Sequence, residues 1–229
     1  MTKPVQMQDG AQTLTDAVMA SLDATFANGA QFEQPYRHWI MSDVFPKAVA
    51  QTLYRLPFET ADLHGVSGKR ELHNDTRKYF DAETNAAYPE CLAVADAFQA
   101  PETVAAIEKA TGADLTGTYV RLEYAQDIEG FWLQPHTDLG VKKFTMLIYL
   151  GEGTDQLDLG TDIYSDAETW AKRPEFTPNT ALIFVPGDNT WHGFEPRAIK
   201  GVRKSVIMNY VTDEWRAREQ LAYPNTPVK

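Results

Sequence analysis

The chain has 229 residues, of which 43% are hydrophobic, so it can bury a sizeable core, and β-barrels and sandwiches of this length often fold as one domain. Its formal net charge of -11 argues against nucleic acid and anionic membranes as partners, because clustered Lys and Arg are needed to bind phosphates. Cys91 is the only cysteine, which excludes an intramolecular disulfide and a multi-cysteine metal site.

The N-terminal residues 1–10 lack the apolar stretch of a signal peptide. No apolar run approaches the length needed to span a bilayer. From these two observations we expect a cytoplasmic protein with no membrane partner.

Residues 1–112 are predicted to be mainly helical. Thr13 and Asp16 have the spacing of a capping box, and Asn28-Gly29 is a stop signal, so one helix is expected between them. Further helices are expected from Pro46, near residues 90–99, and near residues 102–110, where Thr111-Gly112 closes the last one.

After Gly112 the pattern changes to the period of two that is typical of strands. Four such runs occupy residues 118–124, 143–150, 180–185 and 205–211. Short strands separated by turn signals favour an antiparallel sandwich or barrel over a parallel sheet. We therefore predict a single domain, 1–229, with a β core at 113–215, a tail at 216–229, and a loop-rich insertion at 151–178 that carries one or two short strands.

The sharpest local motif is His136-Thr137-Asp138. Residues two apart on a strand project from the same face, so this pair aims an imidazole and a carboxylate at one point. A second motif, Trp191-His192-Gly193, follows the predicted strand at 180–185. Two histidines and one carboxylate can form the facial triad that binds non-haem iron(II) and leaves positions open for cosubstrate and dioxygen.

Arg203 and Ser205 are again two apart on a predicted strand, eleven and thirteen residues beyond His192. A guanidinium group can pair with both oxygens of a carboxylate, so Arg203 is the candidate for holding the distal carboxylate of 2-oxoglutarate, with Ser205 beside it. Without the triad, the simpler interpretation of Arg203 would be a surface charge near a turn.

The order His136-X-Asp138, His192, then Arg203-X-Ser205 resembles the 2-oxoglutarate/iron(II) dioxygenase superfamily. Residues 124–149 are similar to its prolyl 4-hydroxylase-like branch, in which a Tyr precedes the His-X-Asp motif and a Leu-Ile-Tyr-Leu strand follows it, and residues 36–46 resemble the lead-in of these enzymes. The resemblance covers most of the chain. It implies a mainly β fold with N-terminal helices, in which the core is a double-stranded β-helix, the jelly-roll or cupin-like barrel.

Two features depart from the prolyl 4-hydroxylase pattern. Those enzymes usually have Lys where this chain has Arg203, and their Gly-Gly-Glu-Thr strand has only a loose counterpart in residues 159–162. Both departures weaken peptidyl proline as the substrate, while the superfamily resemblance holds.

The resemblance implies Fe(II) as cofactor and 2-oxoglutarate and dioxygen as cosubstrates. Oxidative decarboxylation of 2-oxoglutarate to succinate and CO2 would be coupled to hydroxylation of an unactivated carbon. Members that halogenate lack the carboxylate ligand, so Asp138 favours hydroxylation.

Four further residues are candidates for the site. Tyr124 and Tyr149, on strands flanking the metal motif, could hydrogen-bond the cosubstrate, or they could be core aromatics. Trp191 could form a wall of the substrate pocket or belong to the core. Arg77, in the polar segment 74–78 that includes Asn74, could meet an anionic substrate group or be a solvated loop charge.

We expect a small polar molecule as substrate, because the chain is compact and shows no internal repeat, with a peptide or protein side chain as the alternative. Outside the superfamily, two rivals remain: a cupin-like metal-dependent isomerase or hydrolase, and a non-catalytic jelly-roll binding module. Arg203 separates the oxygenase from a hydrolase, since a hydrolase needs no anion clamp. The triad separates it from a binding module, which needs no metal. The oligomeric state is not predicted.

Overall fold

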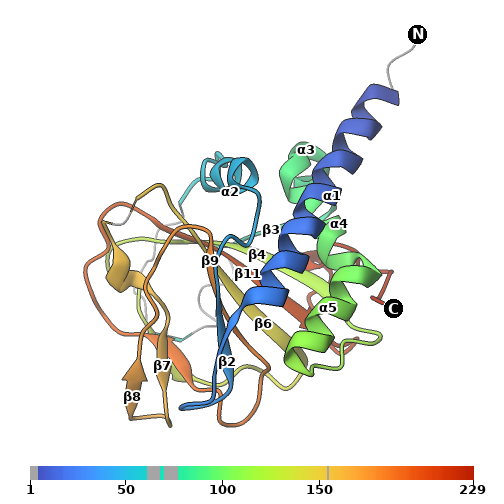
Figure 1. Ribbon diagram of the computed structural model, residues 1–229. Coiled ribbons are helices and arrows are strands. Elements are labelled where there is room, and N and C mark those ends of the chain that lie inside the picture. The colour runs from blue at the N-terminus through green and yellow to red at the C-terminus, as the bar shows by residue number, and fades with distance from the viewer. Residues whose placement is uncertain (1–4, 61–67, 70–76, 154) are drawn as a thin grey trace.

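The computed structural model describes residues 5–60, 68–69, 77–153 and 155–229. Its strands form two antiparallel sheets (Figure 1). The large sheet has the order β1-β2-β9-β6-β11-β4-β3, and the small sheet has the order β5-β10-β7-β8. The strands of the large sheet are β1 Ala30–Phe32, β2 His38–Met41, β3 Lys78–Tyr79, β4 Tyr119–Asp127, β6 Lys142–Leu150, β9 Thr180–Phe184 and β11 Arg203–Val211. Those of the small sheet are β5 Leu133–His136, β7 Asp162–Tyr164, β8 Trp170–Lys172 and β10 His192–Phe194.

Strand β11 lies between β4 and β6 and aligns their side chains. Arg203 is opposite Asp127 of β4, and Ser205 is opposite Tyr149 of β6. Because side chains alternate along a strand, each of these strands presents one face to the small sheet and one to the helices. The period of two therefore decides which residues enter the barrel.

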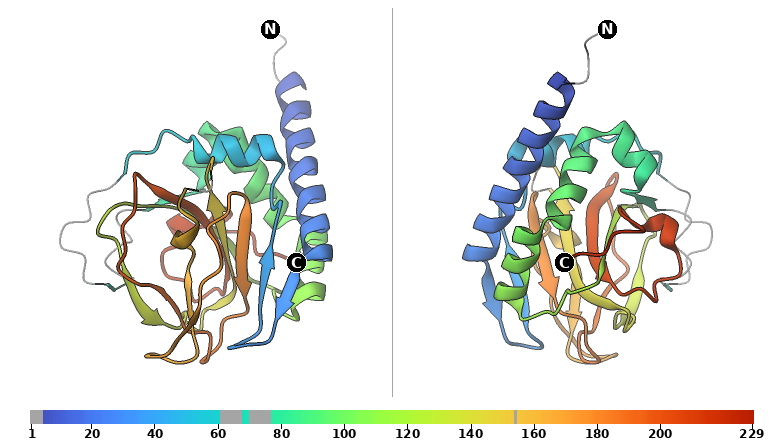
Figure 2. Two further views of the ribbon diagram at one scale, coloured as in Figure 1. Left: turned by 60° about the vertical axis from the view of Figure 1, so that its left-hand side comes forward. Right: turned by 90° about the vertical axis from the view of Figure 1, so that its right-hand side faces the viewer.

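The helices cover the face of the large sheet that is turned away from the small sheet, as Figures 1 and 2 show. Their bounds are α1 Val5–Asn28, α2 Lys47–Tyr54, α3 Ala82–Ala87, α4 Pro89–Gln99 and α5 Pro101–Thr111, and short 3-10 turns occupy Leu157–Leu159 and Arg218–Gln220. Val18, Leu22 and Phe98 from the helices share one buried cluster with Leu122, Met146 and Val206 from the large sheet.

A second buried cluster lies between the two sheets. It joins Leu147, Tyr149 and Phe184 of the large sheet to Ile163 and Phe194 of the small sheet. Apolar burial on both faces of the large sheet supplies the main stabilisation of the fold. Within the barrel, the guanidinium group of Arg203 lies over the rings of Tyr149 and Phe194 from this cluster.

The expected antiparallel architecture and the four long strands are confirmed, with β4 and β11 extending a few residues beyond the predicted bounds. The helix stop at Gly112 is also confirmed, since this residue has φ 74° and caps α5. The predicted start at Thr13 is wrong, because α1 already begins at Val5. Residues 1–112 supply the helices as expected, but also the strands β1, β2 and β3 of the large sheet. None of the described helices is long and apolar enough to cross a membrane.

Candidate metal centre

His136 and His192 come from two neighbouring strands of the small sheet. His136 ends β5, His192 begins β10, and the two residues are direct partners in the strand register. Partners in an antiparallel pair project to the same side, so the two imidazole rings meet with their centroids 4.4 Å apart. The turn between the predicted strand at 180–185 and His192 therefore delivers the distal histidine directly beside the first one.

Each imidazole is oriented by its own backbone. Nδ1 of His136 lies 2.9 Å from the carbonyl oxygen of Gln134, and Nδ1 of His192 lies 2.9 Å from that of Thr190. A neutral ring that donates through Nδ1 has its lone pair on Nε2, which is the atom that then ligates a metal. Burial lowers the pKa of His192 to about 4, so this ring is neutral near pH 7.

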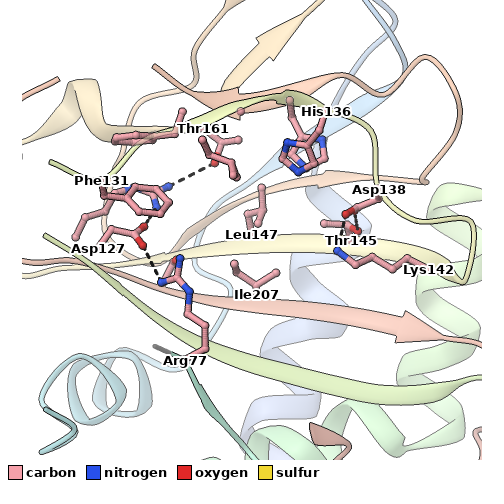
Figure 3. A pocket seen from close by; sticks show the side chains of 16 residues that line it. Arg77, Asp127, Phe131, His136, Asp138, Lys142, Thr145, Leu147, Thr161 and Ile207 are labelled. Atoms are coloured by element: carbon pink, nitrogen blue, oxygen red, sulfur yellow. Dashed lines mark hydrogen bonds and ion pairs between the residues drawn. The ribbon is translucent and has the colours of Figure 1, made fainter. Parts of the chain in front are cut away.

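Asp138 follows β5, but its carboxylate is held by the large sheet. Lys142 places Nζ 2.5 Å from Oδ1, and Thr145 donates its hydroxyl to Oδ2 at 2.6 Å. Burial alone would raise the pKa of Asp138, but Lys142 and His192, together with these hydrogen bonds, hold it well below its usual range. The carboxylate is therefore ionised at neutral pH. Figure 3 shows it turned toward Lys142 and Thr145 beside His136.

The three side chains converge on one point. Potential ligand atoms of His136, Asp138 and His192 all lie within 4.8 Å of one another. Two imidazole nitrogens and one ionised carboxylate are a donor set that suits iron(II) or zinc. The residues present therefore fit a divalent transition metal, and three protein ligands leave coordination positions for other molecules.

Arg203 and Ser205 line the same cavity as the triad. Nε of Arg203 donates to the carbonyl oxygen of Leu159 at 2.7 Å, and Nη1 donates to Oδ2 of Asp127 at 2.6 Å. Arg203 is only 6% exposed, and its guanidinium group packs over the ring of Phe194, with 4.8 Å to the ring centroid. It is a fixed interior cation, which rules out the surface-charge interpretation.

Arg77 is also buried and lines the cavity, at 8% exposed. Nη1 donates to Oδ1 of Asp127 at 2.7 Å, and Nε lies 3.4 Å from a carboxylate oxygen of Glu123. Arg77 is thus not a solvated loop charge. Asn74, from the same polar segment, lies outside the described residues.

The two tyrosines have different positions. Tyr124 points to the helix side of the large sheet, where its hydroxyl donates to the carbonyl oxygen of Leu53 at 2.8 Å. This placement does not bring it to the metal centre, because its neighbours Glu123 and Ala125 are the residues of β4 on the opposite face. Tyr149 lies inside the barrel near Arg203, and its hydroxyl accepts a hydrogen bond from the backbone N–H of Thr161 at 3.1 Å.

Trp191 is half-buried and is not among the residues that line the cavity. Its backbone carbonyl accepts a hydrogen bond from Tyr164, which ties β10 to β7. The residue next to His192 thus supports the small sheet through its backbone, and the position of its side chain gives no support to the pocket-wall role expected from the sequence.

Several residues of the cavity escaped sequence reasoning, among them Asp127, Phe131, Lys142, Thr145 and Thr161. Asp127 had a detectable signal, since it shares the period-two face of Glu123 on β4. Lys142 and Thr145 lie four and seven residues beyond Asp138, at the start of the next strand, a spacing with no strand-face relation to the metal motif.

No protein-family model matches this sequence, and no curated protein matches it. Solved structures do match. A prolyl hydroxylase from Trichoplax adhaerens, in complex with a peptide fragment of the hypoxia inducible factor oxygen degradation domain, is 14% identical with a TM-score of 0.57, covering 94% of this chain and 97% of its own.

Two further prolyl 4-hydroxylases have the same fold. The Pseudomonas putida protein is 15% identical with a TM-score of 0.53, and the match covers 85% of this chain and 94% of that one. The Phytophthora capsici protein is 16% identical with a TM-score of 0.56, over 95% of this chain and 68% of that one. These likenesses confirm the double-stranded β-helix fold.

Proposed function

We propose that the protein is an iron(II)- and 2-oxoglutarate-dependent oxygenase. The observation that carries the proposal is that the His136, Asp138 and His192 ligand set and the buried cation Arg203 line one cavity. The shared fold with prolyl hydroxylases supports it. A metal-dependent isomerase or hydrolase would have no use for Arg203, and a binding module would have no use for the triad.

In this proposal His136, Asp138 and His192 hold the metal, and Arg203 and Ser205 hold the distal carboxylate of 2-oxoglutarate. The bound iron, with 2-oxoglutarate and dioxygen, supplies the oxidising chemistry that hydroxylates an unactivated carbon. The chain's own residues orient the metal ligands and line the cavity. The Nδ1 contacts fix both imidazole rings, Lys142 and Thr145 fix Asp138, and Phe131 and Phe194 give the cavity an apolar wall.

The first test is spectroscopic. Anaerobic addition of 2-oxoglutarate to the iron(II) protein should produce a weak visible charge-transfer band, and substrate-free turnover in air should yield succinate. Bound iron without that band would contradict the proposal.

The second test separates the two sites. Arg203→Ala should weaken 2-oxoglutarate binding by roughly tenfold to a hundredfold, because a charge-assisted hydrogen-bond pair is lost, while metal affinity stays near that of the wild type. Both constants can be measured by calorimetry with manganese(II) in place of iron. Arg37→Ala is the matched control, since Arg37 donates a hydrogen bond to the carbonyl oxygen of Thr111 at the end of α5 and does not line the cavity. Equal losses of metal and 2-oxoglutarate would assign Arg203 a structural role.

For the substrate we propose a small polar molecule, supported by the compact chain, which shows no internal repeat. A peptide or protein side chain is the second candidate, favoured by the fold likeness to prolyl hydroxylases. Panels of both classes, scored by succinate formation above the uncoupled background and by mass spectrometry for a gain of one oxygen, decide between them.

A further inference from the structure

Three buried polar side chains form a row across the inner face of the large sheet. Asn209 of β11 is the register partner of Arg121 on β4 and of Thr145 on β6. Partners on adjacent antiparallel strands project to the same side, so the three side chains lie next to one another. Arg121 and Thr145 are each 1% exposed, and Asn209 is fully buried. Because buried polar groups cost free energy unless they are hydrogen-bonded, the bonds within the row decide how its side chains are oriented.

The amide of Asn209 has one orientation that satisfies its neighbours. Nη1 of Arg121 donates to its Oδ1 at 3.2 Å. Its Nδ2 donates to Oγ1 of Thr145 at 2.9 Å and to the carbonyl oxygen of Phe144 at 3.4 Å. A guanidinium group only donates and a carbonyl oxygen only accepts, so a reversed amide would place donor against donor and acceptor against acceptor. The amide N–H group is therefore committed to Thr145.

This commitment decides where the hydroxyl proton of Thr145 points. The hydroxyl oxygen accepts from Asn209, so its single proton is available for a different partner. That partner is Oδ2 of Asp138, at 2.6 Å. The bonds thus run in one direction, from the guanidinium group of Arg121 to the carboxylate of Asp138. Hydrogen bonds aligned in this way polarise one another, which strengthens the last bond of the chain.

Only one end of the row reaches the cavity. Thr145 and Asp138 line it, and Figure 3 shows the two side chains next to each other. Asn209 and Arg121 are not among the described residues that line the cavity. Since Asn209 is also uncharged, its influence on the metal centre passes through the hydroxyl of Thr145.

We propose that Asn209 is a positioning residue for the metal ligand Asp138. It directs the hydroxyl proton of Thr145 onto the carboxylate, and Arg121 fixes the amide group that does so. The inference rests on the proposed function, because it takes Asp138 as a ligand of the metal. It assigns part of the metal affinity to a side chain that lies outside the cavity.

Asn209→Asp reverses the decisive bond, because it keeps the shape of the side chain and its bond to Arg121 but presents an acceptor to Thr145. Two carboxylates then compete for one hydroxyl proton, and Asp138 loses its bond for part of the time. The added charge also attracts any cation directly. A double-mutant cycle with Thr145→Val cancels this direct effect, since the charge is added in both backgrounds.

The cycle has a definite expected result. Asn209→Asp should change manganese(II) affinity less favourably in the wild type than in Thr145→Val, by roughly tenfold, which corresponds to one hydrogen bond to a charged group. Calorimetric titration of the metal-free proteins measures the affinities, after circular dichroism has shown that each variant is folded. The visible spectrum of the cobalt(II) protein is the second readout. Asn209→Asp should alter it in the wild type and leave it unchanged in Thr145→Val.

Two further variants serve as controls. Thr145→Ser keeps the hydroxyl group, so it should retain the metal affinity of the wild type and its response to Asn209→Asp. Thr118 is also buried, and its hydroxyl donates to the carbonyl oxygen of Leu115 at 2.6 Å, outside the row. In Thr118→Val, Asn209→Asp should therefore have the same effect as in the wild type. If Asn209→Asp does not fold, Asn209→Leu removes the donor and enters the same cycle, with an expected difference of roughly threefold.

The outcomes separate the inference from the proposed function. A wild type that binds no manganese(II) contradicts the proposed function itself. If the wild type binds the metal, an Asn209 substitution with the same effect in the wild type and in Thr145→Val overturns the positioning role. A cobalt(II) spectrum that responds equally in both backgrounds, or a Thr145→Ser protein as weak as Thr145→Val, also overturns it. These results would leave the oxygenase proposal standing.

Discussion

At Asp138, an ammonium group and a metal would compete for one carboxylate. Lys142 lies 2.5 Å from Oδ1 of Asp138, and its side chain is only 10% exposed, so solvent screens the pair weakly. A divalent cation bound at Asp138 would meet the like charge of Lys142 at short range. The lysine thus keeps the carboxylate ionised in the metal-free chain, at a cost in metal affinity.

Lys142→Met should therefore bind manganese(II) more tightly than the wild type, by roughly tenfold, because the competing cation is removed while the methylene volume is kept. Calorimetric titration of the metal-free protein measures the change. Lys143→Met is the matched control, since Lys143 is the exposed neighbour on the same strand. Weaker binding in Lys142→Met would mean that the lysine serves mainly to hold Asp138 in position.

At the scale of residues, the sequence predicted the groups whose chemistry depends on spacing. The Arg-X-Ser pair lies two apart on β11 as expected, whereas Asp138 lies beyond the end of β5, so the strand argument was wrong for the His-X-Asp pair, although both pairs line the cavity. The partners of Arg203 and Arg77 could not be predicted, because they come from segments far apart in the chain. Arg77 and Asp127 are fifty positions apart, and no local pattern links them.

At the scale of elements, the metal centre depends on how closely β10 approaches β5. Gly193 follows His192 at the point of closest contact. A Cβ atom at Gly193 would lie 2.8 Å from the carbonyl oxygen of Leu133 and 3.2 Å from the backbone of Gln134. These backbone atoms of β5 cannot rotate away as a side chain could, so only a glycine permits the spacing that brings His192 to His136.

Gly193→Ala should push the two strands apart and weaken metal binding by roughly tenfold or more, since overpacking strain costs about 1–3 kcal/mol. Metal affinity by calorimetry and the thermal midpoint of the metal-free protein should both fall. Gly140→Ala is the control in the adjacent loop, where an added Cβ would meet nothing within 4 Å. Unchanged metal affinity in Gly193→Ala would show that the small sheet adjusts without moving the ligands.

The long strands could be predicted and the small sheet mostly could not, for a physical reason. β4, β6 and β11 each have nine residues, enough for a period of two to stand out. The strands of the small sheet have three or four residues, too few to show a period. The alternation of apolar and polar residues on β4 also does not reveal which face of the strand meets solvent. In the structure, the face that carries Glu123 and Asp127 points into the barrel and not into solvent.

At the scale of the whole molecule, stability at acid pH depends in part on a buried histidine away from the metal centre. His38 on β2 is fully buried, and its Nε2 has no hydrogen-bond partner within the described part of the chain. Burial lowers its pKa below the usual 6.5, the carbonyl oxygen of Tyr36 opposes this, and the ammonium group of Lys172 adds to it. The folded chain thus keeps His38 neutral at a pH where the unfolded chain protonates it.

Because the unfolded state takes up this proton first, the free energy of unfolding should decrease as pH falls below about 6.5, by about 1.4 kcal/mol for each unit between the two pKa values. His38→Phe should remove this part of the pH dependence. Urea unfolding of the metal-free wild type and variant at about pH 7.5 and about pH 5.5 measures it. The other histidines are present in both proteins, so identical slopes would contradict the assignment.

The anchoring of the three ligands has a mechanical consequence. His136 and His192 belong to the small sheet, whereas Asp138 is fastened to β6 of the large sheet by Lys142 and Thr145. A metal held by all three would cross-link the two halves of the barrel, and its binding energy would add to the energy of folding. The helices pack on the large sheet, so the short-stranded half would lose one of its links to that sheet whenever the metal dissociates, and the apolar cluster between the sheets would remain. Metal supply would then contribute to the stability of the folded chain.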